Sequence, residues 1–431
     1  MFTSEGFKRY FKNTSWLFYE RVLRMIVGIF VSMWVARYLG PEQFGIFSYA
    51  SSFVGLFAIV ATLGLDSIVV RELVSGNNDK GKIIATTFWL KVSGAILVLF
   101  ILFIAVSVAS VGAFEKVLIF IIASAVVFQS FNVIDFYFQS QVMSKYTAYA
   151  NLIALSVASV VKILLILSEA SLVTFAYVVL FESIVLSMGF LYYFASLSKF
   201  KVENLIFNKV LAIKLIKESW PLIFSGMMVA VYMKIDQIMI MEMLGSASVG
   251  QYAIAARLSE SVYFIPSIIS ASLFPALINA KKVSSKLYYS RLQNKFDLLV
   301  WIAISIIITT LFIKDDLINI LVGNEFYESS NILVVHIFAS IFSFLGIASS
   351  KWFVQEGLQK YLLYRSIWGG ILNIVANYFF IQKYGAIGAA YSTVISQVFS
   401  SYVFNVFQQR TRHIFIMQSI TLLAPLRYLK K

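Results

Sequence analysis

The chain has 431 residues, of which 60% are hydrophobic, 16% are aromatic and 13% are charged, and its mean hydropathy is +0.84. A soluble domain could not cover so much apolar surface, because soluble proteins contain roughly 45–50% apolar residues. The formal net charge is +14. Cysteine is absent, and its absence excludes disulfides, thiolate catalysis and cysteine-ligated metals.

Apolar stretches recur along the chain, and each is long enough as a helix to cross a hydrocarbon core of about 30 Å. Water is absent in that core, so the backbone must satisfy its own hydrogen bonds as helices. About twelve such segments can be recognised, with charged residues, glycines or prolines at their ends. The predicted spans are 14–38, 43–65, 83–107, 114–137, 147–168, 172–194, 219–242, 249–278, 297–313, 332–354, 362–381 and 386–408.

The basic residues of the predicted connections predict the orientation. With the N-terminus inside, 24 Lys and Arg residues fall in cytoplasmic connections and four in outer ones. Basic connections stay cytoplasmic, so both termini are predicted to be cytoplasmic. The basic residues are spread over separate loops that face anionic lipid, without a groove-like cluster, so nucleic acid is not a predicted partner.

A repeated string suggests two halves. LGPEQFGIFSYA at 39–50 aligns with LGSASVGQYAIA at 244–255, an offset of 205, and the two strings share glycines at their second and seventh positions. Transporters commonly contain such repeats, with the substrate site between them. The predicted parts are an N-terminal six-helix lobe at 1–194, a cytoplasmic basic linker helix at 195–218, a C-terminal six-helix lobe at 219–408 and a cytoplasmic basic tail at 409–431.

No cofactor or metal site is predicted. GNNDKGKI at 76–83 has the spacing of a nucleotide-binding loop, but Ile83 stands where a Ser or Thr hydroxyl should hold Mg²⁺. The two histidines, His336 and His413, are far apart in the sequence. Transport is therefore expected to use no ATP bound by this chain, and coupling to H⁺ or Na⁺ is the alternative energy source.

Basic residues inside the predicted spans suggest a watery cavity. Each costs about 2.5–3.5 kcal/mol at the centre of a helix, so several of them imply water or partner charges. Lys162 and Lys351 are close enough to span ends to reach the membrane surface. The residues in question are Arg21, Arg24, Lys91, Lys162, Lys234, Arg257 and Lys351.

Acidic residues in the spans leave several interpretations open. Arg257 and Glu260 are three residues apart, so they can form a local ion pair. Lys234 and Asp236 are two apart and point in different directions on one helix, so at least one of them must have a partner elsewhere. Glu182 has no basic neighbour three or four residues away, so it is either protonated in a packed interior or a coupling carboxylate.

Several strings resemble Wzx-type polysaccharide flippases, within the multidrug/oligosaccharidyl-lipid/polysaccharide exporter superfamily that includes the MATE antiporters and the lipid II flippases. The strings extend over nearly the whole chain, although Gln139-Ser140-Gln141 departs from the usual Gly and acidic residue. They are VARYLGPEQFGIFSYA at 35–50, LGLDSIVVREL at 63–73, NVIDFYFQSQVMSKY at 132–146, MKIDQIMIMEMLGSASVGQYAIAARLSE at 233–260 and NIVANYFFIQKYGAIGAAYSTVISQ at 373–397.

The resemblance implies an all-α polytopic membrane protein with about twelve transmembrane helices in two pseudo-symmetric six-helix lobes, as in MATE proteins. It also implies a non-enzymatic flippase of a bacterial inner membrane that moves undecaprenyl-diphosphate-linked oligosaccharide for O-antigen, capsule or exopolysaccharide. Expected partners are membrane lipid, a polysaccharide polymerase and a chain-length regulator.

Candidate site residues follow from this interpretation. For binding of diphosphate or sugar they are Arg24, Lys234, Arg257 and Lys91. For gating or coupling they are Asp66, Arg71, Glu182, Asp236 and Glu260. The resemblance places Arg71, Asp236 and Arg257 at recurrent polar positions of the family without fixing their roles.

Two other functions compete with this interpretation. A cation-coupled multidrug antiporter of the same fold would need cavity carboxylates, which Asp236 and Glu182 could supply. A membrane enzyme such as a sugar polymerase or ligase would need a large outer loop with catalytic groups. The longest predicted outer loop, 314–331, is short.

Overall fold

A computed structural model describes residues 5–75, 79–108, 111–198 and 205–423. Within these ranges the secondary structure is helical and no strand occurs, which confirms the predicted all-α class. Seven helices of the described part are long and apolar enough to cross a membrane, and up to nine if each of two bent helix pairs is one span. The number of twelve spans stays a prediction.

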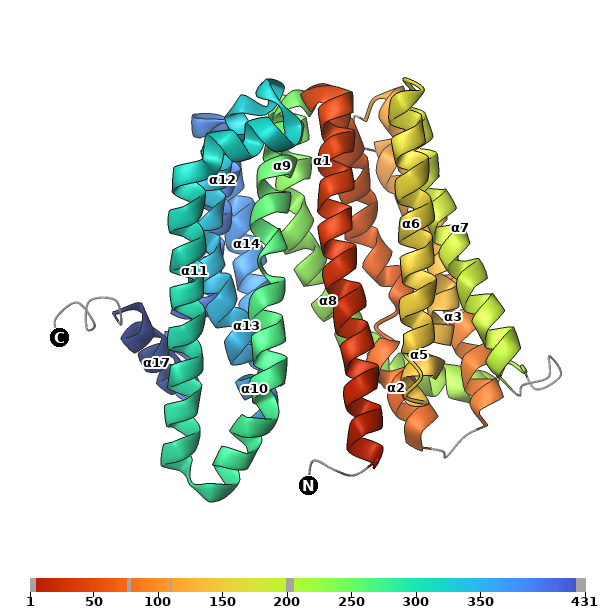
Figure 1. Cartoon of the computed structure of the whole chain (residues 1–431), viewed down its shortest axis with the longest axis vertical. Helices are drawn as coiled ribbons and strands as arrows, with labels where there is room; N and C mark the ends of the chain where they lie inside the picture. Colours follow the sequence, from red (N-terminus) through yellow and green to blue (C-terminus); the bar gives the residue numbers. More distant parts are fainter. Residues whose placement is uncertain (1–4, 76–78, 109–110, 199–204, 424–431) are drawn as a thin grey trace. The chain divides into compact units, whose positions relative to one another are not determined.

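The first of two compact units holds Met1–Leu39 and Ile46–Ala230. Its α6 packs against α7, and α4 packs against both α3 and α7. The described helices are α1 (Glu5–Thr62), α2 (Asp66–Ser75), α3 (Lys80–Val108), α4 (Ala113–Phe128), the 3₁₀ helix Gln129–Asn132, α5 (Val133–Ser140), α6 (Lys145–Leu167), α7 (Leu172–Leu197) and the first part of α8 (Lys209–Leu244). They are coloured from red to yellow-green in Figure 1.

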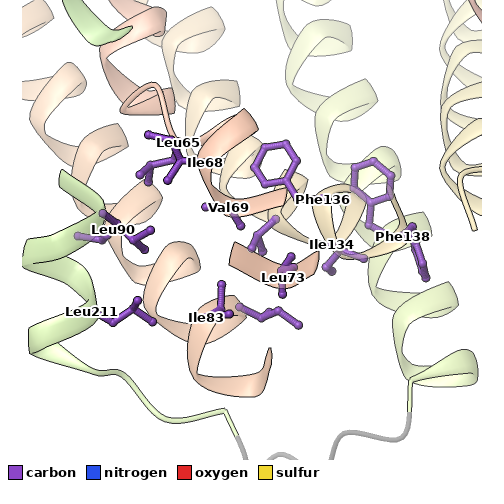
Figure 2. Close-up of a cluster of buried hydrophobic side chains, with 14 of the residues drawn as sticks. Leu65, Ile68, Val69, Leu73, Ile83, Leu90, Ile134, Phe136, Phe138 and Leu211 are labelled. Carbon is purple, nitrogen blue, oxygen red and sulfur yellow. The ribbon is translucent and has the colours of Figure 1, made fainter. Parts of the chain in front are cut away.

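The hydrophobic core of this unit gathers around α2. The short helix buries Ile68, Val69 and Leu73, and it packs against α3 and α5. Figure 2 shows these side chains in one buried cluster with Phe136 of α5 and Leu211 of α8. Asp66 and Arg71 of α2 are exposed and lie outside this core.

Helix α8 begins directly after the predicted linker region. Asn208 caps it, because its side-chain oxygen accepts a hydrogen bond from the backbone N–H of Leu211 at 2.9 Å. Residues 209–218 form the first turns of α8 and bury Leu211 and Leu215, while 199–204 lie outside the described residues. The division of the chain into two units falls within this helix, between Ala230 and Val231. The predicted domain boundaries stay a prediction.

The second unit holds Gly40–Gly45 and Val231–Lys431. Leu299 of α11, Phe344 of α13 and Met417 of α17 share its core, so the described part of the predicted tail is packed. Residues 424–431 lie outside the described part. The further helices are α9 (Ser246–Ser261), α10 (Phe264–Val283), α11 (Ser285–Val322), the 3₁₀ helix Asn324–Phe326, α12 (Tyr327–Ile337), α13 (Ala339–Gln355), α14 (Gln359–Tyr384), α15 (Ala386–Val398), the π-helix Phe399–Val403, α16 (Phe404–Phe407) and α17 (Arg412–Leu422).

The first glycines of the two repeated strings have the same unusual backbone conformation. Gly40 has φ 70° and ψ 173°, and Gly245 has φ 89° and ψ 177°. A side chain at either position would be strained in this left-handed region. Gly40 divides α1 into two helices, and Pro41 follows it at the start of the second, where a missing N–H costs nothing.

The second glycines of the strings lie in reciprocal close contacts. A Cβ atom at Gly45 would lie 1.8 Å from the carbonyl oxygen of Ser246, and one at Gly250 would lie 2.0 Å from that of Pro41. Both contacts join one copy of the string to the other, and the partners Pro41 and Ser246 are themselves related by the offset of 205. Residues 41–45 of the first copy therefore pack against residues 246–250 of the second, backbone to backbone.

Candidate functional site: charged groups of the two units

Lys91 and Asp66 of the first unit form a pair. The Lys91 side chain on α3 is 2% exposed, and its Nζ lies 3.4 Å from Oδ1 of Asp66, the first residue of α2. The ammonium also lies 4.5 Å from the centre of the Phe136 ring. Asp66 is 61% exposed, so the structure joins a predicted binding cation to a predicted gating carboxylate that solvent reaches.

A third polar group nearby was missed by the sequence analysis. Asp135 of α5 accepts hydrogen bonds from Oγ1 of Thr147 at 2.7 Å and from Nε2 of Gln139 at 2.9 Å. Gln139 belongs to the string that departs from the family pattern, and here it orients a carboxylate. The available signal was a single Asp inside the apolar span predicted at 114–137.

Arg24 of α1 is paired and still accessible. Its Nε lies 3.1 Å from Oε1 of Glu20, one helical turn earlier, and the Glu20 side chain is 2% exposed. The Arg24 side chain is 50% exposed. Because a guanidinium carries five N–H donors, this pair orients Arg24 and leaves donors for an anion. Arg21, three residues earlier, is exposed.

Arg71 belongs to an ion-pair network between α2 and α8. It contacts Glu218 and lies 3.3 Å from Glu72. Nζ of Lys214 lies 3.1 Å from each oxygen of Glu72. Two carboxylates and two cations thus tie the start of α8 to α2. The gating role predicted for Arg71 stays a prediction.

Glu182 of α7 finds its partner on another helix. Its Oε2 lies 3.1 Å from Nζ of Lys162 on α6, and both side chains are partly exposed. A search three or four residues along α7 could not reveal this cation. Lys162 therefore forms an ion pair between α6 and α7, and it also lies near the end of a predicted span.

Asp236 is the most thoroughly hydrogen-bonded of the candidate residues in the second unit. This buried residue of α8 accepts hydrogen bonds from the hydroxyl of Tyr252 at 2.6 Å, from Nδ2 of Asn377 at 2.6 Å and from Oγ1 of Thr393 at 2.7 Å. The donors come from α9, α14 and α15, and Asn373 lies close enough to Asn377 to accept a hydrogen bond at 3.3 Å. Four helices thus converge on one carboxyl group.

Lys234, Arg257 and Glu260 surround a second charged region of this unit. Glu260 lies close enough to Lys234, Asp236 and Arg257 to interact electrostatically with all three. Arg257 is exposed, and Lys234 and Glu260 are intermediate in exposure. The structure therefore places two predicted binding cations and two predicted coupling carboxylates in one neighbourhood.

His336 is a packing residue in the described structure. It is buried on α12, its Nδ1 lies 2.9 Å from Oγ of Ser259 on α9, and its ring meets that of Tyr252 edge to face. Across the described ranges, no three His, Asp or Glu side chains gather in a way that could hold a metal ion.

The sequence profile described as polysaccharide biosynthesis protein matches residues 10–281. The chain belongs to that family. The capsular polysaccharide biosynthesis protein CapF of Staphylococcus aureus is 22% identical over 400 residues, which cover 90% of this chain and 96% of CapF. A protein of Shigella flexneri named as an O-antigen transporter is 26% identical over 416 residues, which cover 88% of this chain and 93% of that protein.

The fold matches a solved membrane transporter. An inward-facing multidrug resistance MATE family transporter of the MOP superfamily superposes with a TM-score of 0.73 at 13% identity, covering 92% of this chain and 96% of the other. The family and the fold confirm the predicted resemblance, and they make this chain a MATE-like, multi-pass membrane protein of polysaccharide biosynthesis.

Proposed function

We propose that this protein is a flippase that moves undecaprenyl-diphosphate-linked oligosaccharide from the cytoplasmic to the periplasmic leaflet of a bacterial inner membrane. Family membership and the relative named as an O-antigen transporter carry this proposal. The flippase works by alternating access in O-antigen, capsule or exopolysaccharide synthesis. A polymerase and a chain-length regulator act on the delivered units.

The charged groups of each unit support a diphosphate cargo. Arg24 in the first unit, and Lys234 and Arg257 in the second, keep accessible surface inside predicted spans. An arginine can donate two parallel hydrogen bonds to a phosphate, which a lysine cannot do. In this proposal Arg24 and Arg257 are each candidate ligands of the diphosphate, Lys91 and Lys234 add positive charge within their own units, and the prenyl chain stays in lipid.

Asp236 supports coupling of the transport cycle to H⁺ or Na⁺. A buried carboxylate that accepts three hydrogen bonds is an oxygen-rich place for a proton or a small cation. Glu260, next to it, would relay the ion, and Asp66, Arg71 and Glu182 would serve gating. The MATE fold and Asp236 also favour a second candidate function, a cation-coupled multidrug antiporter.

Reconstituted protein should flip the proposed cargo. We expect proteoliposomes to expose a fluorescent prenyl-diphosphate-linked oligosaccharide to an impermeant quencher about tenfold faster than protein-free liposomes. An inward-directed Na⁺ or proton gradient should change this rate in the wild type and should have no effect with Asp236→Asn. Equal rates with and without protein would refute the flippase function, whereas gradient-independent flipping would refute only the coupling.

The proposed orientation can be measured at the two ends of α11 (Figure 1). The chain has no native cysteine, so single cysteines report cleanly. In intact cells an impermeant maleimide should label Asn324→Cys and spare Lys286→Cys, because basic connections stay cytoplasmic. Both native residues are exposed, whereas Ser329 in the same outer loop is buried against Gln251 and would report poorly. The reverse labelling pattern would overturn the orientation.

A further inference from the structure

Helix α17 runs beside the first turns of α11 (Figure 1). The ring of His413, near the start of α17, meets the ring of Tyr289 edge to face, with 4.4 Å between the centroids. Two turns further along α17, Oγ1 of Thr421 donates a hydrogen bond to Oδ1 of Asp297 at 2.7 Å. The partners in both pairs are 124 positions apart in the sequence, so the two helices run in the same direction and in register.

Helix α17 is too short to span a membrane. It has 11 residues, Arg412–Leu422, whereas a span needs about 20. On α11, which has 38 residues, the exposed large apolar side chains begin at Leu298, and the predicted span begins at Asp297. Because Thr421 contacts Asp297, the end of α17 lies at the level where the exposed apolar surface of α11 begins.

One face of α17 is buried and the other is exposed. The buried face packs against α11 and α16 and belongs to the core of the second unit. The exposed face consists of Arg412, Ile416 and Ile420 and of Leu423 directly after the helix. These residues are spaced by four, four and three positions, which places them on one side of a helix. Apolar side chains that lie exposed together mark a contact with lipid or with another protein.

Two observations favour lipid on this face. Its apolar end lies at the same level as the start of the exposed apolar surface of α11, within the span predicted at 297–313, so one bilayer can cover both surfaces. Its other end is the basic residue Arg412. The change from basic to apolar along the face therefore follows the change from headgroups to acyl chains in an anionic leaflet.

We propose that α17 enters the cytoplasmic leaflet with its apolar end first. Ile420 and Leu423 contact acyl chains, which removes them from water, and Arg412 lies among the lipid phosphates, to which a guanidinium can donate hydrogen bonds. The described part of the tail at 409–431 is then a membrane contact of the second unit. This contact does not depend on the transport function, and only the identity of the leaflet rests on the proposed orientation.

Fluorescence quenching of single-cysteine variants tests the contact in the whole protein. The chain has no native cysteine, so a bimane label reports on one position at a time. The labelled protein is reconstituted in vesicles of phosphatidylcholine and phosphatidylglycerol, with or without a nitroxide-labelled lipid. We expect this lipid to lower the fluorescence of Leu423→Cys by about half, that of Ile420→Cys by less and that of Ile416→Cys least, because Ile416 lies about 10 Å further out along the helix.

Two exposed positions of α11 are the controls. Phe312→Cys, inside the predicted span, should be quenched by the nitroxide lipid, and Lys286→Cys, in the first turn, should be quenched by iodide added on both sides of the membrane. Iodide quenching at Ile420 and Leu423 as strong as at Lys286, without quenching by lipid, would contradict the proposal.

Protection of Ile420 and Leu423 from both quenchers would also contradict it. That result would assign the face to a second copy of the chain, and oxidative cross-linking of Ile420→Cys would detect the dimer. All three labelled apolar positions are exposed, so each tolerates cysteine without a change in the core, and a variant that fails to fold leaves the other two as tests.

Discussion

Replacing Gly45 or Gly250 with alanine should prevent the protein from accumulating in a folded form. A Cβ atom at these positions would lie 1.8 or 2.0 Å from a backbone carbonyl oxygen, and a backbone cannot rotate away as a flexible side chain can. Overpacking in a core costs about 1–3 kcal/mol and occasionally more, and here part of a helix must move. Thermal unfolding of detergent-solubilised protein, followed by size-exclusion chromatography, measures the loss.

Two other glycines provide matched controls for this prediction. A Cβ atom at Gly28 or Gly370 would meet nothing within 4 Å, so alanine there should leave the melting temperature unchanged or raise it. Gly45 and Gly250 also approach each other, since the Cβ of Gly45 would lie 2.9 Å from the backbone nitrogen of Gly250. With alanine at both positions, the cost should therefore be less than the sum of the single substitutions. Additive costs would show that the two contacts are independent.

Removing the charge of Arg24 or Arg257 should lower surface-polysaccharide production by about 10- to 100-fold at equal membrane protein level. A hydrogen bond to a charged group contributes about 1.5–3 kcal/mol, which corresponds to that range of rate or affinity. Arg24→Lys and Arg257→Lys should retain part of the activity, because lysine keeps the charge and loses the two-pronged geometry. Polysaccharide per unit of immunodetected protein is the measurement.

Arg410→Ala is the control for this series, because Arg410 is exposed and lies outside the predicted spans. Normal polysaccharide from both Arg24→Ala and Arg257→Ala would end the hypothesis of a cationic binding surface. Drug resistance that disappears with Asp236→Asn would then favour the multidrug antiporter. Low protein level in the Ala variants, rescued by Lys, would instead assign the arginines to folding.

The local sequence predicted the helices and several of their ends. Gly40 and Gly245 marked breaks where the backbone takes a left-handed conformation, and glycine tolerates that conformation best. The apolar stretches predicted helices, because a membrane span must satisfy its own backbone hydrogen bonds. The repeat offset of 205 relates Gly45 to Gly250 and Pro41 to Ser246 in the sequence. It did not predict that Gly45 contacts Ser246 or that Gly250 contacts Pro41.

The sequence could not predict the partner of a charged residue where that partner lies on a different helix. Lys162 pairs with Glu182 from α6, and Asp236 collects its three donors from α9, α14 and α15. Glu20 with Arg24, by contrast, is a pair within one helix, at the i, i+4 spacing that the sequence displays. Predicting the others requires knowing which faces of which helices pack together.

The sequence by itself thus determined the membrane class and the helical state, because hydropathy and backbone satisfaction are local properties of a segment. It left Lys295 just outside the span predicted at 297–313, whereas the structure places this residue inside α11, against the carbonyl oxygen of Ala348 on α13. Only the tertiary structure decided this. The environment of a long basic side chain depends on which neighbouring helix covers it, and that packing joins residues more than fifty positions apart for Lys295 and Ala348.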